Sequence, residues 1–304
     1  MYSLSLRLSS AVRTVALLLA MVLSASACSD SQHPAASLAP SDSAKVEYIN
    51  DGSPAGISLR SDLATGAQGP AFWLMPDSGV TLVGGYLSSW GDASLNGMGV
   101  SSVPTPERPA FIRHALAGRS AMRFDGGRQK LTIAPGFGSA TALSLSLSYR
   151  PATNGANAVL LAFGNGAVGA TANNFTLQRA GSSDTLLIVR TVGTNTTSLR
   201  LAGGFASGVA RFLEITSDGT GATTATLDGA TVVSGTLSPF GAALRTKNVL
   251  GASNITGTGV PFAGDVGDLI TYQRHLPSAD KAGVQSYFAP NTTVAPVTVR
   301  ASLW

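Results

Sequence analysis

The chain has 304 residues with a formal net charge of +4, and 44% of them are hydrophobic while 12% are charged. This length and apolar content can fill the core of one large domain or two small ones. The charge is too small for a nucleic-acid-binding surface, especially as Arg7 and Arg13 lie in a segment that we expect to be removed. The low charge, the 35 glycines and the many short β-branched runs predict an all-β fold.

Residues 1–28 resemble a bacterial lipoprotein signal peptide. The two arginines precede an apolar run, Val15 to Leu23, that is too short to span a bilayer stably. The run leads to Ala25-Ser26-Ala27-Cys28, which resembles the lipobox at which a cysteine receives its lipid. Cys28 is the chain's single cysteine and is therefore the expected lipidation site. Ordinary signal-peptidase cleavage after Ala27 is the alternative.

The residues that follow this segment predict an anchored, tethered domain. Ser29 after the cysteine resembles lipoproteins carried to the outer membrane, so we expect a lipid-anchored protein of the bacterial cell envelope, in the outer membrane. Residues 29–44 are small, polar and proline-containing, which predicts a flexible tether. Residues 45–70 hold one possible strand, Val46 to Ile49, among glycine and proline breakers, and are predicted to be an N-terminal extension packed on the domain. Residues 291–304 are the C-terminal tail.

The domain itself is predicted to occupy residues 71–290. Leucine and serine alternate from Leu143 to Tyr149, so the leucines should face the core and the serines the solvent. Asp218-Gly219 and Asp228-Gly229 have turn chemistry and separate short strands. The expected strands are 72–75, 80–83, 121–125, 130–133, 143–149, 158–163, 175–178, 185–191, 211–216, 223–227, 231–233, 249–252 and 267–272.

One helix is predicted near the end of the domain, over Ser278 to Phe288. Ser278 is its expected N-cap, because a serine oxygen can accept a hydrogen bond from the first backbone N–H groups of a helix. Val284, Tyr287 and Phe288 are its expected buried residues. About a dozen strands with turn residues between them predict a β-sandwich.

Six short pieces of the chain carry a family resemblance. They are FWLMPDSGVT (72–81), SSWGDASLNG (88–97), RP (108–109), LAGRSAMRFDG (116–126), TLDG (226–229) and FAGDVGDLITYQRHL (262–276). In this order they resemble bacterial laminin G-like domains of the concanavalin A-like lectin/glucanase superfamily. The resemblance implies a jelly-roll sandwich of two antiparallel sheets in which residues 71–75 and 267–272 are neighbouring strands. It also implies binding of a carbohydrate or a protein on a concave face or at rim loops, without naming the ligand-binding residues.

Catalysis is not expected. A glycosidase needs two carboxyl groups flanking the scissile bond, and Glu47, Glu107 and Glu214 do not form the E-x-D-x-x-E pattern that the superfamily's glucanases carry. Glu214 is expected on the solvent face of its strand. His114 lies in a stretch expected to be an exposed connection, and His275 is expected at the surface of a strand-to-helix corner.

A metal or cofactor is not expected either. Asp92, Ser94, Asn96 and Gly97 repeat the first half of a calcium-binding loop, but Val103 stands where an EF-hand needs its bidentate acid. The pattern therefore predicts a turn stabilised by its own side chains. The alternative is a calcium ion at a loop rim, as some laminin G-like domains bind.

Three aromatic residues are candidates for stacking against a sugar: Trp73, Tyr86 and Trp90. Trp73 lies in an apolar strand and Trp90 in a family motif, so both are expected to be buried. The sequence thus predicts a lipid-anchored, non-catalytic binding module for a glycan or a surface protein. A glycan-processing enzyme of the glucanase type and a structural subunit of a surface assembly are the alternatives.

Overall fold

The structure, a computed structural model, describes residues 46–50, 69–94, 96–136 and 140–289. The predicted signal peptide with Cys28, the tether, the C-terminal tail and most of the N-terminal extension lie outside the described residues. In the part of the chain that is described, no helix is long and apolar enough to cross a membrane.

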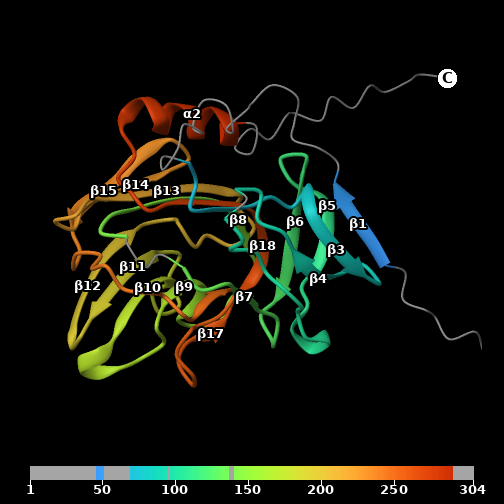
Figure 1. The fold of residues 1–304 in the computed structure, drawn as a ribbon, viewed down its shortest axis with the longest axis horizontal. Helices are drawn as coiled ribbons and strands as arrows, with labels where there is room; N and C mark the ends of the chain where they lie inside the picture. The colour runs from blue at the N-terminus through green and yellow to red at the C-terminus, as the bar shows by residue number, and fades with distance from the viewer. Residues whose placement is uncertain (1–45, 51–68, 95, 137–139, 290–304) are drawn as a thin grey trace, which may run out of the picture. The chain divides into compact units, whose positions relative to one another are not determined.

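The larger of two β-sheets, sheet A, contains 11 strands among the described residues. In spatial order these are β1 (Val46–Asn50), β3 (Ser78–Val83), β4 (Tyr86–Trp90), β5 (Ala110–Leu116), β6 (Arg119–Asp125), β18 (Ala263–Tyr272), β8 (Leu143–Pro151), β13 (Arg211–Ser217), β14 (Ala222–Leu227) and β15 (Ala230–Thr236), with β2 (Phe72–Leu74) also paired to β18 (Figure 1). Neighbouring strands are antiparallel.

The smaller sheet, sheet B, contains seven strands among the described residues. In spatial order these are β12 (Asn195–Leu201), β11 (Leu186–Val192), β10 (Asn173–Arg179), β9 (Ala158–Gly164), β16 (Asn248–Leu250) and β7 (Leu131–Ile133), and the two-residue β17 (Val260–Pro261) pairs in parallel with β9. Two short 3-10 turns, η1 (Thr105–Glu107) and η2 (Gly169–Thr171), lie in connections.

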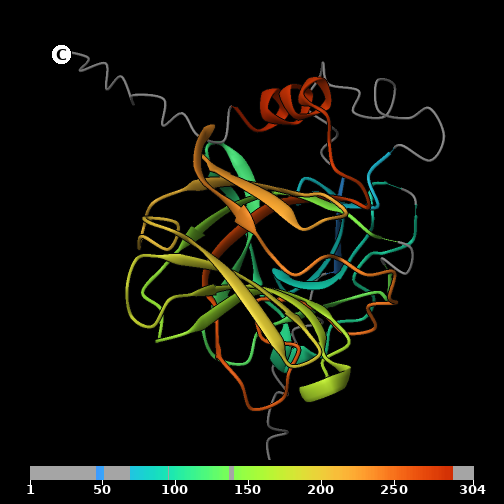
Figure 2. The same ribbon diagram turned by 90° about the vertical axis from the view of Figure 1, so that its left-hand side faces the viewer.

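The main core fills the space between the two sheets, which Figure 2 shows as two layers of strands. Leu145 and Leu147 of β8 contribute from sheet A, while Phe175 and Leu177 of β10 contribute from sheet B, and all four are fully buried. Side chains two residues apart on a strand share a face, so this alternation places both apolar rows in one interior.

The predicted all-β sandwich of two antiparallel sheets with one short C-terminal helix is confirmed. The predicted neighbours near the chain ends are also confirmed, because β2 pairs with β18 from Leu74 opposite Leu269 to Phe72 opposite Thr271. Part of the N-terminal extension does pack on the domain, since β1 pairs with β3. Strands β4, β5, β12 and β17 were not predicted.

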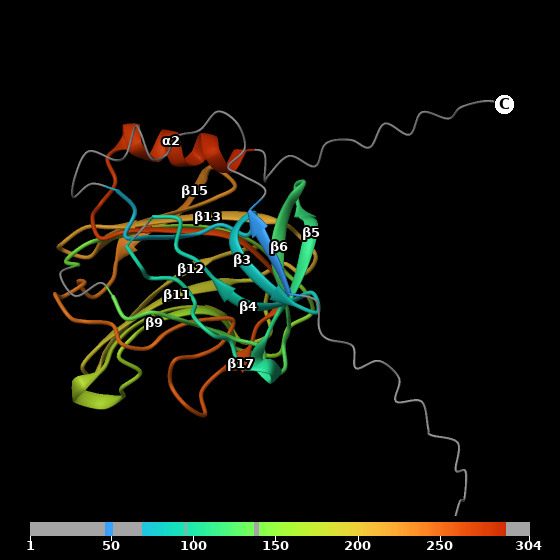
Figure 3. The ribbon, with the colours of Figure 1, turned by 45° about the vertical axis from the view of Figure 1, so that its right-hand side comes forward.

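The helix α2 (Ser278–Phe288) lies on the outer face of sheet A, away from sheet B (Figure 3). Its predicted buried residues are buried, and they close a second apolar cluster with Trp73, Phe212, Ile270 and Tyr272 of the sheet. The predicted N-cap is wrong by one residue: Pro277 occupies that position, and no side chain caps the helix there.

The prediction that the serines of β8 face solvent is wrong. Ser144, Ser146 and Ser148 are all at most 3% exposed, because the chain leading into α2 and the bulge in β18 cover this face. The Ser144 hydroxyl donates to the carbonyl of Arg274 at 2.9 Å and accepts from the Leu276 N–H at 3.0 Å. Sheet A is therefore buried on both faces along its central strands.

Candidate functional site

The residues after Trp90 form a turn whose polar groups bond to one another and to β2. Asp92 Oδ1 accepts from the backbone N–H groups of Trp73 and Ser94, both at 2.9 Å, and Asp92 Oδ2 accepts from that of Met98 at 3.0 Å. Asn96 Nδ2 donates to the Pro70 carbonyl at 2.8 Å. The carboxylate that would lead a calcium loop is thus engaged by three backbone donors. Among the described residues there is also no group of three or more His, Cys, Asp or Glu side chains that could hold a metal.

Two of the three candidate stacking aromatics are buried, as predicted. Trp90 is fully buried and its Nε1 donates to the Met75 carbonyl at 3.0 Å. Trp73 is 3% exposed and packs edge-on against Tyr287 of α2, with ring centroids 5.3 Å apart. Tyr86 is 49% exposed at the start of β4. A tryptophan platform for a sugar is therefore not available at Trp73 or Trp90.

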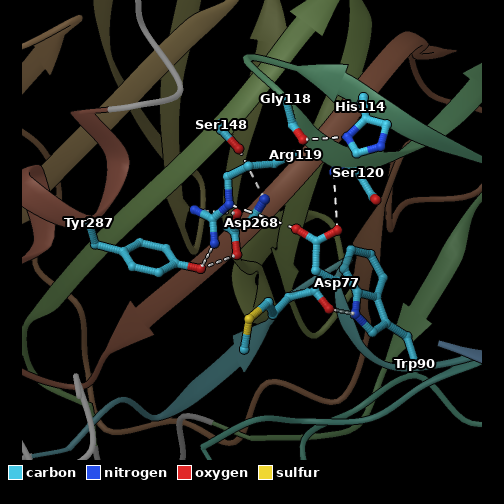
Figure 4. A network of polar contacts seen from close by, with 10 residues as sticks. Asp77, Trp90, His114, Gly118, Arg119, Ser120, Ser148, Asp268 and Tyr287 are labelled. Carbon is cyan, nitrogen blue, oxygen red and sulfur yellow. Dashed lines mark hydrogen bonds and ion pairs between the residues drawn. The ribbon is translucent and has the colours of Figure 1, made fainter. Parts of the chain in front are cut away.

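A buried polar network fastens α2 to sheet A (Figure 4). Arg119 of β6 lies 3.2 Å from Asp268 Oδ2 of β18 and also donates to the hydroxyl of Tyr287, which itself donates to Asp268 Oδ1 at 2.8 Å. Burial raises the pKa of Asp268, an effect that the Arg119 charge opposes. Burial and the neighbouring Asp268 raise the pKa of Tyr287, so its hydroxyl remains a donor. The network joins the helix to two strands and lies beneath the surface.

Glu214 is buried under α2, which contradicts its predicted place on a solvent face. It is 2% exposed, and its Oε2 accepts from Gln285 at 2.7 Å and from Thr226 at 3.3 Å. Burial raises the pKa of Glu214, and these hydrogen bonds, with the charge of Lys281, offset that rise in part. Glu214 is thus enclosed rather than open to a substrate.

The two domain histidines are exposed, as predicted, but His114 does not lie in a connection. It belongs to β5, where its backbone is left-handed at φ +55° and interrupts the pairing with β6. Its Nδ1 lies 2.8 Å from the carbonyl of Gly118 in the following hairpin turn. His275 is exposed at the corner before α2.

An open groove of about 700 Å³ lies on the outer side of sheet B, at its β7 edge. Thr132 of β7 and Val249 of β16, which are cross-strand partners, form part of its floor. One wall holds η1 and the β6–β7 turn, which a hydrogen bond from Lys130 N to the Glu107 carbonyl ties together at 3.1 Å. The loop before β17 forms the other wall, at the same end of the sandwich as η1 (Figure 3).

The loop wall, residues 252–259, is held in shape by its own polar groups. The hydroxyls of Ser253 and Thr258 lie 2.8 Å apart, and Thr258 also donates to the Ile255 carbonyl at 2.9 Å. The buried amide of Asn254 donates to the Lys247 carbonyl at 3.1 Å. At the base, Gly251 has φ +88° and a Cβ there would lie 2.4 Å from the Phe124 ring, so the chain needs glycine. The groove is therefore preformed.

The groove offers hydrogen-bonding groups and positive charge. Its polar lining includes five hydroxyls, from Thr132, Thr246, Ser253, Thr256 and Thr258. Its charged lining consists of Arg128, Lys130, Lys247 and Glu107. Local sequence patterns do not predict this site, because its walls come from three separate segments that meet only in the folded chain, through the pairing of β7 with β16 and the hydrogen bond between Lys130 and Glu107.

Comparisons with known proteins place the fold but not the family. No family model matches the chain, and comparison with curated proteins finds no match. The laminin G-like assignment therefore stays a prediction.

Several solved structures are similar. The binding domain of Paraclostridial Mosquitocidal Protein 1 has a TM-score of 0.51 at 12% identity, over 72% of this chain and 51% of that one. Domain 4 of AbnA, a GH43 extracellular arabinanase from Geobacillus stearothermophilus, in complex with arabinotriose, has a TM-score of 0.49 at 17% identity, over 67% of this chain and 92% of that one. The CBM40 of the Ruminococcus gnavus IT-sialidase, bound to α2,3 sialyllactose, has a TM-score of 0.41 at 16% identity, over 49% of this chain and 84% of that one. The likeness to the binding domain of Paraclostridial Mosquitocidal Protein 1 concerns the fold alone, which in this chain is a two-sheet β-sandwich.

Proposed function

We propose that this protein is a non-catalytic binding module of the bacterial cell envelope, anchored by lipid at Cys28, whose groove takes a carbohydrate. The observation that carries the proposal is the preformed groove on sheet B with its row of hydroxyl groups. A sugar presents many hydroxyls that need partners of both kinds, and a threonine or serine hydroxyl both donates and accepts. A rigid loop wall binds without first having to be ordered, which favours affinity.

The groove's acidic content favours binding over glycoside hydrolysis. Hydrolysis requires two carboxyl groups on either side of the scissile bond, whereas Glu107 is the one carboxylate among the described residues that line the groove. Glu107 is moreover paired with Lys130, whose Nζ lies 3.2 Å from Glu107 Oε1. Asp268 and Glu214, the carboxylates with raised pKa values, lie on the other sheet beneath α2.

The proposal is tested by blocking the floor of the groove. Thr132→Trp places a large ring at the exposed centre of β7, and we expect it to weaken binding to any oligosaccharide that the purified full-length chain selects on a glycan array by about tenfold or more. Ser198→Trp, exposed on β12 at the opposite edge of the same sheet, is the matched control. Equal loss in both variants, no glycan bound at all, or turnover of a glycan would contradict the proposal.

A further inference from the structure

We infer that the groove selects negatively charged oligosaccharides, an inference that rests on the function proposed above. Of its four charged lining residues, Lys130 and Glu107 neutralise each other across 3.2 Å. Arg128 and Lys247 make no ion pair with any residue in the described part of the chain. The groove lining therefore contains two positive charges that no described residue neutralises.

Both cations stand on backbone that the fold holds in place. The turn carrying Arg128 is fixed on either side, because Gly127 N donates to Asp125 Oδ1 at 2.7 Å and Asp125 N donates to Gln129 Oε1 at 2.9 Å. The Asp125 carboxylate is thus held by a hydrogen bond within this turn, and Asp125 is not among the residues that line the groove.

Lys247 is fixed in a similar way at the other side. Its N–H donates to the Gly164 carbonyl at 2.8 Å and its carbonyl accepts from Asn254 Nδ2 at 3.1 Å. Its side chain runs close past Gly166, where a Cβ would lie 2.5 Å from Lys247 Cδ. The absence of a side chain at position 166 thus leaves room for the side chain of this lysine.

The two cations, Arg128 and Lys247, differ in how they bind an anionic group. A guanidinium offers parallel N–H donors that match a carboxylate or a sulfate, while an ammonium acts as a compact point charge. The hydroxyls of Thr132, Thr246 and Thr256 remain for the neutral parts of the sugar, whereas those of Ser253 and Thr258 hold the loop wall together. Because the groove is open to solvent, the ionic part of the binding should be sensitive to salt.

The test uses charged and uncharged forms of the same oligosaccharide. Oligogalacturonate is compared with its methyl ester, and a sulfated oligosaccharide with its desulfated form, so that the two arms separate a carboxylate from a sulfate. For the full-length protein we expect the charged member of at least one pair to bind about tenfold more tightly, and this preference to shrink as salt rises from about 50 mM to about 500 mM. Equal binding within both pairs would overturn the inference and leave the proposed function standing. Binding of no member would overturn the inference, while the glycan array described above decides the proposed function separately. Equal affinity for polyglutamate would show charge attraction without sugar recognition and would also overturn the inference.

Substitutions of the charged residues in the groove should change the affinity for the charged probe in opposite directions. Arg128→Gln and Lys247→Gln should each weaken binding of the charged probe about fivefold, whereas Glu107→Gln should strengthen it by releasing Lys130. Arg200→Gln is the matched control, since Arg200 is exposed on β12 and makes no ion pair with the described residues. The inference is wrong if the Arg200 variant loses as much affinity as the Lys247 variant. It is equally wrong if Glu107→Gln weakens binding while the circular dichroism spectrum stays unchanged.

Discussion

At the scale of single residues, Glu214 ties stability to pH. Burial raises the pKa of Glu214 in the folded chain, so the fold gains stability below the unfolded-state pKa and loses this gain as the pH rises through the folded-state pKa. We expect Glu214→Gln to raise Tm relative to the parent at about pH 8 and to leave little difference at about pH 4. Thermal unfolding followed by circular dichroism measures both. A difference of the same size at the two pH values would mean that the carboxylate charge is not its cause.

The same residues show how far local sequence patterns reach. Trp73 could be predicted as buried because an apolar neighbourhood along a strand points to a core whichever layer supplies it, and Trp90 because it lies in a motif of the family that the chain resembles. Glu214 and the serines of β8 could not be placed correctly. Their period-two alternation is the same whether the polar face meets water or a covering helix. The covering helix lies more than sixty residues farther along the chain, so no local pattern reveals it. Burial of a polar face is decided by tertiary packing.

At the scale of elements, α2 is a cover that sheet A requires. Val284 is fully buried in the second apolar cluster, between α2 and sheet A, whereas Ala282 is exposed on the same helix. Val284→Asp buries a charge without a partner, and we expect it to lower the free energy of unfolding by about 3 kcal/mol or more. Ala282→Asp should change it by less than about 0.5 kcal/mol. Chemical denaturation gives both values, and a similar small change in the two variants would refute the packing role.

The elements that escaped prediction share a physical reason. β12 is an edge strand in which most residues are exposed or half-exposed, so it lacks the apolar alternation that marks a strand. β5 is interrupted by the left-handed backbone of His114, which breaks the regular register. The helix, by contrast, was predicted with its correct bounds from Ser278 and from three apolar residues at helical spacing, although the serine is not the N-cap. The groove could not be predicted, because no single segment contains it.

At the scale of the whole molecule, the proposed anchor lies far in sequence from the proposed groove. Cys28→Ser removes the thiol that would carry the lipid, and we expect nearly all of the protein to move from the membrane pellet to the soluble fraction, because the acyl chains that would hold it in the membrane could no longer be attached. Ser29→Ala keeps the cysteine and should remain in the pellet. Cell fractionation with immunoblotting measures the distribution, and retention of the Cys28 variant would remove the lipid-anchor proposal.

The pairing of β1 with β3 determines where a shortened form of the chain can begin without exposing the edge of sheet A. β1 supplies the ladder partners for Ser78 to Val83 at the margin of sheet A. A shortened version starting at residue 71 would leave the backbone N–H and C=O groups of β3 open, and such a bare margin recruits copies of itself into aggregates. Soluble preparations should therefore begin upstream of Val46, so that β1 protects the protein from self-association.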